Sequence, residues 1–324
     1  MDQFMEIKHE HPNTILFFRM GDFYELFHED AQVAAPVLGL ALTSRDKNAE
    51  NPIPMAGFPW HALEDNLKIM LKSGFKVTVA EQEQQLREGA KLLERVVTRI
   101  YTPGSLYEES LLATNERSVL SSIVLAKSAL SMAVIDSSTG ESWAATWSDN
   151  ERFSSLEDEL LRWNPAEIVL SSKDAENDNL CSIFANLNNC VISQHNVNKK
   201  RRIERLESIL QVSDLGHLDL DSSPLSIEAA GLAADYLAEV HFNSEIPLRD
   251  LQIIEETGHL VVDQTTLRNL EITATLSGDY DGSLISSMNY CRTAMGRRLL
   301  KTWLLRPLHQ LDAIELRHNA VRSL

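Results

Sequence analysis

Cysteine is scarce in this chain of 324 residues, which holds only three. Cys181, Cys190 and Cys291 form no C-x-x-C pair, and their number is odd. Zinc sites need closely spaced ligands and disulfide frameworks need paired cysteines, so neither is predicted. Such cysteine usage fits a reducing cytoplasm. At this length the chain is expected to form two or three domains, each with its own core.

Long apolar runs are also missing. The longest, Val119–Ala126 and Ala129–Ile135, are far shorter than the roughly 20 residues that a membrane-spanning helix needs. Residues 1–11 mix charged and apolar side chains, and they lack the basic start and apolar centre of a signal peptide. We therefore expect no membrane span, no export and a cytoplasmic location.

Positive charge is in short supply, since the formal net charge is -17. Phosphate contacts dominate non-specific binding to nucleic acid, so this balance argues against a protein that grips DNA mainly through a basic surface. Residues 1–104 nevertheless hold 11 Lys or Arg against 15 Asp or Glu, a net of about -4. Most of the acidity lies after residue 104, so residues 1–104 should repel DNA less than the rest of the chain.

Two chemical signatures are absent as well. No G-x-x-x-x-G-K-[ST] loop occurs anywhere in the sequence, so this chain alone is not expected to hydrolyse ATP. The histidines show no H-x-x-x-H spacing, and Glu-x-x-His pairs such as Glu6 with His9 and Glu25 with His28 lack further ligands nearby. The sequence therefore predicts no metal site.

The apolar pattern divides the chain into three parts. Residues 1–104 alternate short strands with helices and predict an α/β domain, in which the strands lie at 14–20, 75–80 and 95–101 and the helices at 28–38 and 60–73. The Thr102-Pro103-Gly104-Ser105 turn residues and the acidic stretch after them predict a linker over residues 105–117.

A second α/β unit is predicted over residues 118–245. Its strands lie at 118–126, 131–135, 141–147 and 166–170, with hairpin residues at 136–140 and a helix at 154–163. Strand signals mostly disappear after Ile227, and a long helical tail starts at Ser283 and is interrupted at Pro307. Residues 246–324 are thus predicted to be mostly helical, and they end at Leu324 without a cap, as a truncated chain would.

Several motifs then carry a resemblance to a known family. The stretch Phe17-Phe-Arg-Met-Gly-Asp-Phe-Tyr-Glu-Leu-Phe27 resembles the mismatch-reading motif of the MutS family, whose core is Phe-x-Glu. Further matches follow in order, at Leu42–Arg45, Pro52–Pro59 with His61, Val96–Gly104, Asp263–Glu271 and Thr293–Leu308. The resemblance spans nearly the whole chain. One departure is Ala80-Glu81-Gln82, where the family usually has Cys-Glu-Gln and then an Asp-Pro turn.

The resemblance implies a mixed α/β fold of three parts. These are an α/β mismatch-binding domain, a connector domain with a ribonuclease-H-like sheet, and the all-α start of the helical core. It implies recognition of mismatched or unpaired bases in double-stranded DNA, which initiates mismatch repair. It also implies a MutL-type partner on the connector domain and a homodimer in full-length members. ATP and Mg would belong to the family's C-terminal ATPase domain, so no cofactor and no enzymatic activity are expected in this chain.

Phe23 and Glu25 occupy the Phe-x-Glu positions of the motif. An apolar wedge that enters a base step costs a few kcal/mol of unstacking, and least where pairing is already faulty. Phe23 is therefore expected to be the wedge, and Gly21-Asp22 would form a turn that lifts its ring from the sheet. Burial of Glu25 by DNA would raise its pKa, so that it could donate to a base and discriminate. Phe17, Phe18 and Phe27 are expected to be packing residues.

Three further residues match family positions. Met55 lies in a proline-bounded loop that approaches the minor groove in the family, although a lone Met is ordinarily core filler. Arg45 and Arg99 are candidate phosphate contacts, although a surface Arg is ordinarily solvated. The dense basic run Lys199–Arg202, with Arg205, is expected to be a solvated helix face or a partner surface rather than a DNA contact.

Two rival functions remain open at this point. Asp136 ends a strand where a ribonuclease-H-like nuclease would keep a metal-binding carboxylate, but a turn-capping Asp explains it more simply. The alternative is a pure interaction module that recruits repair partners, which the acidity after residue 104 favours for the connector region.

Overall fold

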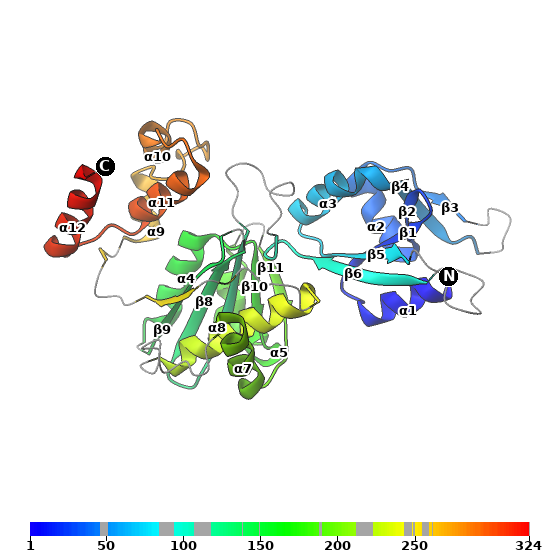
Figure 1. Ribbon diagram of the computed structural model, residues 1–324, viewed down its shortest axis with the longest axis horizontal. Helices are drawn as coiled ribbons and strands as arrows, with labels where there is room; N and C mark the ends of the chain where they lie inside the picture. The colour runs from blue at the N-terminus through cyan, green and yellow to red at the C-terminus, as the bar shows by residue number, and fades with distance from the viewer. Residues whose placement is uncertain are drawn as a thin grey trace.

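The computed structural model describes most of the chain, namely residues 1–45, 51–83, 94–106, 118–137, 139–148, 150–187, 190–211, 223–242, 248, 250–254, 259–260 and 262–323. Figure 1 shows two α/β units side by side, with a helical region at the C-terminal end. The mixed α/β class predicted from the sequence is confirmed. Most of the predicted linker, residues 107–117, lies outside the described residues. Residues 84–93, which follow the segment where the sequence departs from the family pattern, also lie outside them.

The first unit is built on a six-stranded mixed sheet of order β3-β4-β2-β1-β5-β6. Strand β1 runs parallel to β5, and the other neighbouring strands are antiparallel. Its elements are α1 (Asp2–Glu10), β1 (Ile15–Met20), β2 (Phe23–Phe27), α2 (His28–Leu38), β3 (Thr43–Ser44), β4 (Pro54–Pro59), the 3-10 helix η1 (Trp60–Ala62), α3 (Leu63–Lys72), β5 (Val77–Gln82) and β6 (Arg95–Tyr101).

Helices cover this sheet on both faces, because its central strand β1 is apolar at successive positions and so buries both sides. Helices α2 and α3 pack on the face that carries Phe17, with Leu67 and Met70 among the buried residues. Helix α1 packs on the opposite face, where Phe4 meets Phe18 and Phe27 edge-on, with ring centroids 5.7 and 5.2 Å apart. Phe17, Phe18 and Phe27 are all buried, which confirms their predicted packing role.

A buried ion pair fastens α1 to this sheet. Asp30, in the first turn of α2, is only 3% exposed, and its carboxylate accepts from Lys8 Nζ at 2.7 Å and from the Leu16 backbone N–H at 2.9 Å. Lys8 also donates to the Thr14 carbonyl at 2.5 Å. Burial raises the pKa of Asp30, and the Lys8 and Leu16 donors oppose that rise. One carboxylate therefore joins α1, β1 and α2.

The second unit has another six-stranded sheet, of order β11-β10-β7-β8-β9-β12. Strands β7, β8 and β9 are antiparallel, and the remaining pairs are parallel. Its elements are β7 (Val119–Leu125), β8 (Leu130–Asp136), β9 (Glu141–Trp147), α4 (Arg152–Trp163), β10 (Glu167–Leu170), α5 (Ser172–Ala175), α6 (Asp178–Phe184), β11 (Val191–Gln194), α7 (Lys199–Leu210), α8 (Pro224–Val240) and β12 (Asp250–Ile253).

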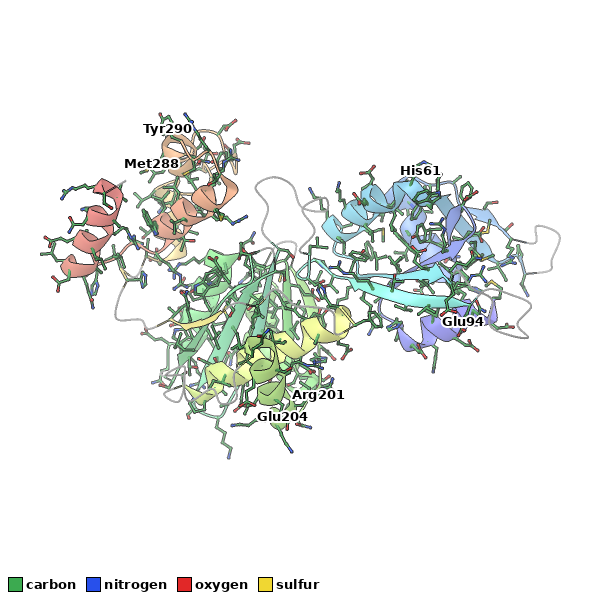
Figure 2. All side chains as sticks on the ribbon, in the orientation of Figure 1. His61, Glu94, Arg201, Glu204, Met288 and Tyr290 are labelled. Carbon is green, nitrogen blue, oxygen red and sulfur yellow. The ribbon has the colours of Figure 1, made fainter. Side chains whose placement is uncertain are left out.

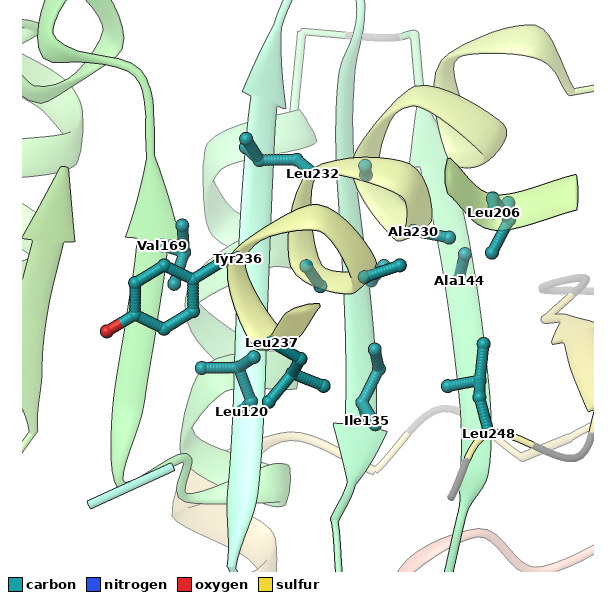
Figure 3. Packing of buried hydrophobic residues seen from close by; sticks show 14 of the residues in the cluster. Leu120, Ile135, Ala144, Val169, Leu206, Ala230, Leu232, Tyr236, Leu237 and Leu248 are labelled. Carbon is teal, nitrogen blue, oxygen red and sulfur yellow. The ribbon is translucent and has the colours of Figure 1, made fainter. Parts of the chain in front are cut away.

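Helix α8 lies across one face of this second sheet. Figure 3 shows Leu232 and Leu237 turned toward the strands that carry Leu120 and Ile135, and the Tyr236 ring beside Val169 of β10. Small residues on α8 let its neighbours approach closely: a Cβ added at Gly231 would lie 2.4 Å from the Arg202 carbonyl oxygen of α7. Helices α4 and α6 pack on the other face, where Leu160 of α4 and Leu180 of α6 share a buried cluster with sheet residues such as Ile123. The second sheet is thus buried on both sides.

Strand β12 carries this sheet past the predicted domain boundary at residue 245. Asp250 pairs with Glu141 and Ile253 with Ala144, in parallel with β9. The sequence pattern missed this strand because its four residues alternate polar and apolar side chains for too short a stretch to stand out.

The C-terminal region is helical, but its helices are shorter than predicted. Its helices are α9 (Gln264–Asn269), α10 (Leu284–Met288), α11 (Ala294–Leu305) and α12 (Leu311–Arg322). The predicted tail from Ser283 breaks after Met288, and α11 restarts at Thr293, whose hydroxyl accepts from the Gly296 N–H at 3.1 Å. The predicted break at Pro307 is confirmed. Within the described residues, no helix has the length and apolarity needed to cross a membrane.

Candidate functional site

Phe23 lies at the tip of the hairpin that joins β1 and β2. Gly21 adopts a positive φ of 60°, which glycine accommodates without strain, and Met20 pairs with Phe23 across the turn. The Trp60 N–H donates to the Asp22 carbonyl at 2.9 Å, which ties the turn to the end of β4. Phe23 is 48% exposed. The predicted turn is confirmed, but Phe23 stays in the sheet and is exposed because β2 begins there.

Glu25 shares the face of the sheet on which the Phe23 side chain lies, because the two residues are two apart in one strand. It pairs with Phe18 on one side and with Gly57 on the other. Burial raises the pKa of Glu25, and the nearby Arg45 charge opposes the rise. A Cβ at Gly57 would lie 3.7 Å from the Glu25 Cγ, so the glycine leaves that flank of the carboxylate open.

Arg45 and Met55 lie on the same side of the sheet as Glu25. The Arg45 guanidinium sits 5.6 Å from the ring centroid of Phe27, which is the next residue of β2 on this face. Met55 pairs with Phe27 and is partly buried against the cluster under α1. The structure therefore brings four of the five predicted site residues, Phe23, Glu25, Arg45 and Met55, to one face of one sheet.

Arg99 lies elsewhere. It sits near the end of β6 that enters the second unit, with its guanidinium 4.5 Å from the Tyr101 ring centroid and its Nη2 donating to the Ser105 carbonyl at 3.5 Å. Burial and, next, the charge of Arg99 lower the pKa of His241 to about 4. The predicted phosphate contact is thus placed at the junction between the units, away from the Phe23 hairpin.

Three residues near the hairpin were missed by sequence reasoning. Arg95 donates from Nε to the Arg19 carbonyl at 3.3 Å and lies 5.6 Å from the Phe18 ring centroid. Arg19 lies between Tyr24 and Trp60, at 5.3 and 5.2 Å from their ring centroids. Trp60 itself is 51% exposed. Arg19 and Arg95 thus bring positive charge to the hairpin. Their proximity follows from the pairing of the strands, so no local sequence signal could have revealed it.

Comparison with known proteins assigns all three parts of the chain to one family. Family models match in order: MutS domain I over residues 1–110, MutS domain II over residues 117–250 and MutS domain III over residues 265–324. The chain belongs to the MutS family. The first unit is domain I, the family's mismatch-binding domain, and the second is domain II, its connector domain.

Curated relatives agree with this assignment. A DNA mismatch repair protein MutS from Syntrophomonas wolfei is 36% identical over 329 residues, and one from Caldanaerobacter subterraneus is 33% identical over 326 residues. A third, from Desulforapulum autotrophicum, is 36% identical over 327 residues. These alignments cover 100%, 100% and 99% of this chain but only 38%, 37% and 36% of the relatives. The chain therefore spans less than two fifths of the length of these MutS proteins.

The rival nuclease site gains no support in domain II. Asp136 is buried at the end of β8, and its backbone carbonyl accepts from the Thr139 and Gly140 N–H groups at 3.1 and 2.8 Å, which closes the turn into β9. Among the residues that the structure describes, no group of three His, Cys, Asp or Glu side chains is placed to hold a metal ion. The backbone of Asp136 therefore forms part of the turn between β8 and β9.

The basic run on α7 is engaged with acidic residues of domain II. Lys199 pairs with Glu228 at 2.7 Å, and Lys200 lies 3.7 Å from Glu204. Arg201 and Arg205 both approach the buried Asp235, at 3.0 and 3.4 Å; Figure 2 places Arg201 and Glu204 at the edge of this unit. One residue of the run departs from the predicted solvated face: Arg202 is buried and donates to the Val197 carbonyl at 3.1 Å.

Proposed function

We propose that this chain recognises mismatched or unpaired bases in double-stranded DNA, as the first step of mismatch repair, by inserting Phe23 from the minor groove. One observation carries the proposal. In the sheet of a MutS domain I, the neighbouring aromatic residues Phe17, Phe18 and Tyr24 are buried, whereas Phe23 stands half exposed at the tip of a hairpin. An exposed ring at the end of a rigid sheet is suited to enter a base step.

The specificity of such a wedge comes from the DNA. A mispair is less well stacked and more easily deformed than a correct pair, so the unstacking cost is lower there. The Phe23 ring stacks on the displaced base and so gains about 1 to 3 kcal/mol whatever the base is. Arg45 and Met55, on the same face, are placed to meet the backbone and the groove, and Arg95 adds positive charge near the hairpin.

Glu25 adds discrimination rather than affinity. A carboxylate beside phosphates is repelled, but a protonated carboxyl can donate to an unpaired base acceptor, which a correct duplex does not offer. Partial burial already raises the pKa of Glu25 in the absence of DNA, and Arg45 keeps that rise in check. Insertion beside the base would bury Glu25 further and favour the protonated form.

The role of Glu25 predicts a pH dependence of defined sign. As the pH falls through the raised pKa of Glu25, the protonated fraction grows, so affinity for a mismatched duplex should increase while affinity for a matched duplex changes less. We expect the preference for the mismatched duplex to rise by about 3- to 10-fold over this pH range. In Glu25→Gln, whose side chain carries an N–H donor at every pH, the preference should no longer change with pH. The measurement is a fluorescence titration across pH, with Glu29→Gln on α2 as the exposed control. Equal loss of affinity for both duplexes in Glu25→Gln would contradict a discriminating role.

The proposed function is tested by a competition titration at moderate salt. A labelled duplex with a G·T pair or a single unpaired T is displaced by unlabelled matched or mismatched competitor. We expect a preference for the faulty duplex. The binding should be weak, because the chain is acidic and offers few cationic contacts, and it should fall as salt rises, because those contacts are made to phosphates. Equal competition by the two duplexes would refute mismatch reading by this chain.

Partner binding is a second proposal, and it concerns domain II. The acidity of the chain after residue 104 disfavours DNA there and suits a protein partner. We propose that domain II receives a MutL-type repair protein and that the longer MutS proteins act as homodimers. ATP binding and hydrolysis would belong to the part of those proteins beyond this match, since this sequence has no P-loop.

A further inference from the structure

Glu167 is a buried carboxylate at the junction of domains I and II. It is the first residue of β10 and has 0% exposure. Four donors converge on it. From the domain I side, Lys76 Nζ lies at 3.2 Å and the Gly104 N–H at 3.2 Å. From domain II, the Tyr236 hydroxyl lies at 2.5 Å, and the Ser193 hydroxyl also donates.

Lys76 supplies the opposite charge. Its side chain is 18% exposed, and its Nζ also donates to the Tyr236 hydroxyl at 3.0 Å and lies 5.3 Å from the centroid of that ring. Burial, followed by the charge of Glu167, raises the pKa of Tyr236 well above its usual value, so Tyr236 remains a phenol donor. A buried carboxylate without such partners would be strongly unfavourable, so the ion pair and its donors depend on each other.

The backbone of Lys76 is also hydrogen-bonded to β1, the strand that leads to the Phe23 hairpin. Its carbonyl accepts from the Ile15 N–H at 2.8 Å, where β1 begins beside β5. Strand β1 then runs to Met20 and the hairpin that carries Phe23. The junction therefore holds one end of the central strands, and the reading tip lies at the other end.

Gly104 lies where the chain passes from domain I to domain II, and it packs directly against Glu167. A Cβ added there would lie 2.8 Å from the Glu167 Cβ and 2.9 Å from the Leu120 Cδ1, so only glycine fits. The Ser118 hydroxyl donates to the Pro103 carbonyl at 3.1 Å, and that of Ser137 donates to the Gly104 carbonyl at 2.9 Å. The Thr-Pro-Gly segment is thus held on the sheet of domain II by several independent contacts.

We propose that Glu167 is a positioning residue that fixes domain I on domain II, so that the connector sets the direction in which Phe23 meets DNA. Donors from both domains bind this one carboxylate. Removal of its counter-charge, Lys76, should therefore let the two domains move relative to each other. The inference goes beyond the proposed function, and its structural half can be tested without DNA.

The test compares the full chain with a single and a double variant, and it measures the distance between the two domains by pulsed electron spin resonance. Spin labels are placed on the exposed Cys181 of α6 and on Glu64→Cys at the exposed start of α3, with Cys190→Ser and Cys291→Ser. We expect one narrow distance distribution in the parent chain and a broad one in Lys76→Met, which leaves Glu167 buried and uncompensated. Lys76→Met with Glu167→Gln should narrow the distribution again, because no unpaired charge remains.

Stability gives a parallel readout. Lys76→Met should lower the unfolding midpoint by roughly 10 °C, and the double variant should recover a substantial part of that loss. Lys68→Met, which removes a partly exposed lysine of α3, should change neither the distances nor the midpoint. If Lys76→Met does not fold, Tyr236→Phe removes one donor to Glu167 while it keeps the ring, and it should broaden the distribution less.

The outcomes separate this inference from the proposed function. An unchanged distance distribution in Lys76→Met, or no recovery in the double variant, would overturn the positioning role and leave mismatch binding untouched. If the positioning role holds, the mismatch preference of Lys76→Met should fall several-fold and return in the double variant. Failure of the parent chain to prefer a mismatch would instead count against the proposed function, while the distance measurements would stand.

Discussion

Replacing Phe23 with alanine is expected to lower affinity for a mismatched duplex by about 10- to 100-fold, and to change affinity for a matched duplex far less. The size of the effect corresponds to the roughly 1 to 3 kcal/mol that stacking of one base on an aromatic ring contributes. The fold should be unaffected, because Phe23 is half exposed at the end of β2 and fills no core position. The same fluorescence competition that tests the proposed function measures the loss.

A matched control for this substitution lies in domain II. Phe242 is 44% exposed, close to the exposure of Phe23, and follows the end of α8, so Phe242→Ala removes a similar exposed ring away from the hairpin. It should leave the mismatch preference unchanged. A preference for the faulty duplex that survives Phe23→Ala would rule out the wedge, even if the chain still binds DNA.

Asp30→Ala is expected to lower the free energy of unfolding of domain I by about 3 to 5 kcal/mol, the usual result when one partner of a buried ion pair is removed. The substitution leaves Lys8 without its carboxylate and the Leu16 N–H without its acceptor. Helix α1 should then detach from the sheet face that carries Phe18 and Phe27. Urea unfolding, followed by circular dichroism, measures the change.

The neighbouring residue provides the control for this prediction. Glu29 precedes Asp30 in the first turn of α2 but is exposed, so Glu29→Ala should change stability by no more than about 0.5 kcal/mol. A loss of under about 1 kcal/mol in Asp30→Ala would show that the buried pair contributes little net stability.

Local sequence patterns were enough for the elements that carry strong periodicity. Helix α2 and strands β6 and β9 begin and end where the pattern predicted. Strand β4 was missed because Pro54 and Pro59 bound it, and proline ordinarily marks a turn. Helix α1 was missed because Met1, the residue before it, offers no side chain to cap the free N–H groups.

The candidate site shows the same division between local and long-range information. Phe23 and Glu25 follow from one motif, since both lie in β2. Their grouping with Arg45 and Met55 required the register of β2 with β4 and of β3 with β4, which no single segment encodes. Arg99 matched the family pattern as well as Arg45 did, yet β6 carries it toward domain II. Glu167 and its donors come from five separate stretches of chain, so only the fold reveals them.

The central claim, that Phe23 enters the base stack at a mispair, is tested most directly with 2-aminopurine placed beside an unpaired T. This base analogue fluoresces weakly when stacked and brightly when unstacked. At saturating protein, the chain should raise the emission of the faulty duplex but not that of the matched duplex, and Phe23→Ala at saturation should leave both unchanged. An equal rise with Phe23→Ala, or no rise with the parent chain bound to the faulty duplex, would contradict insertion of Phe23.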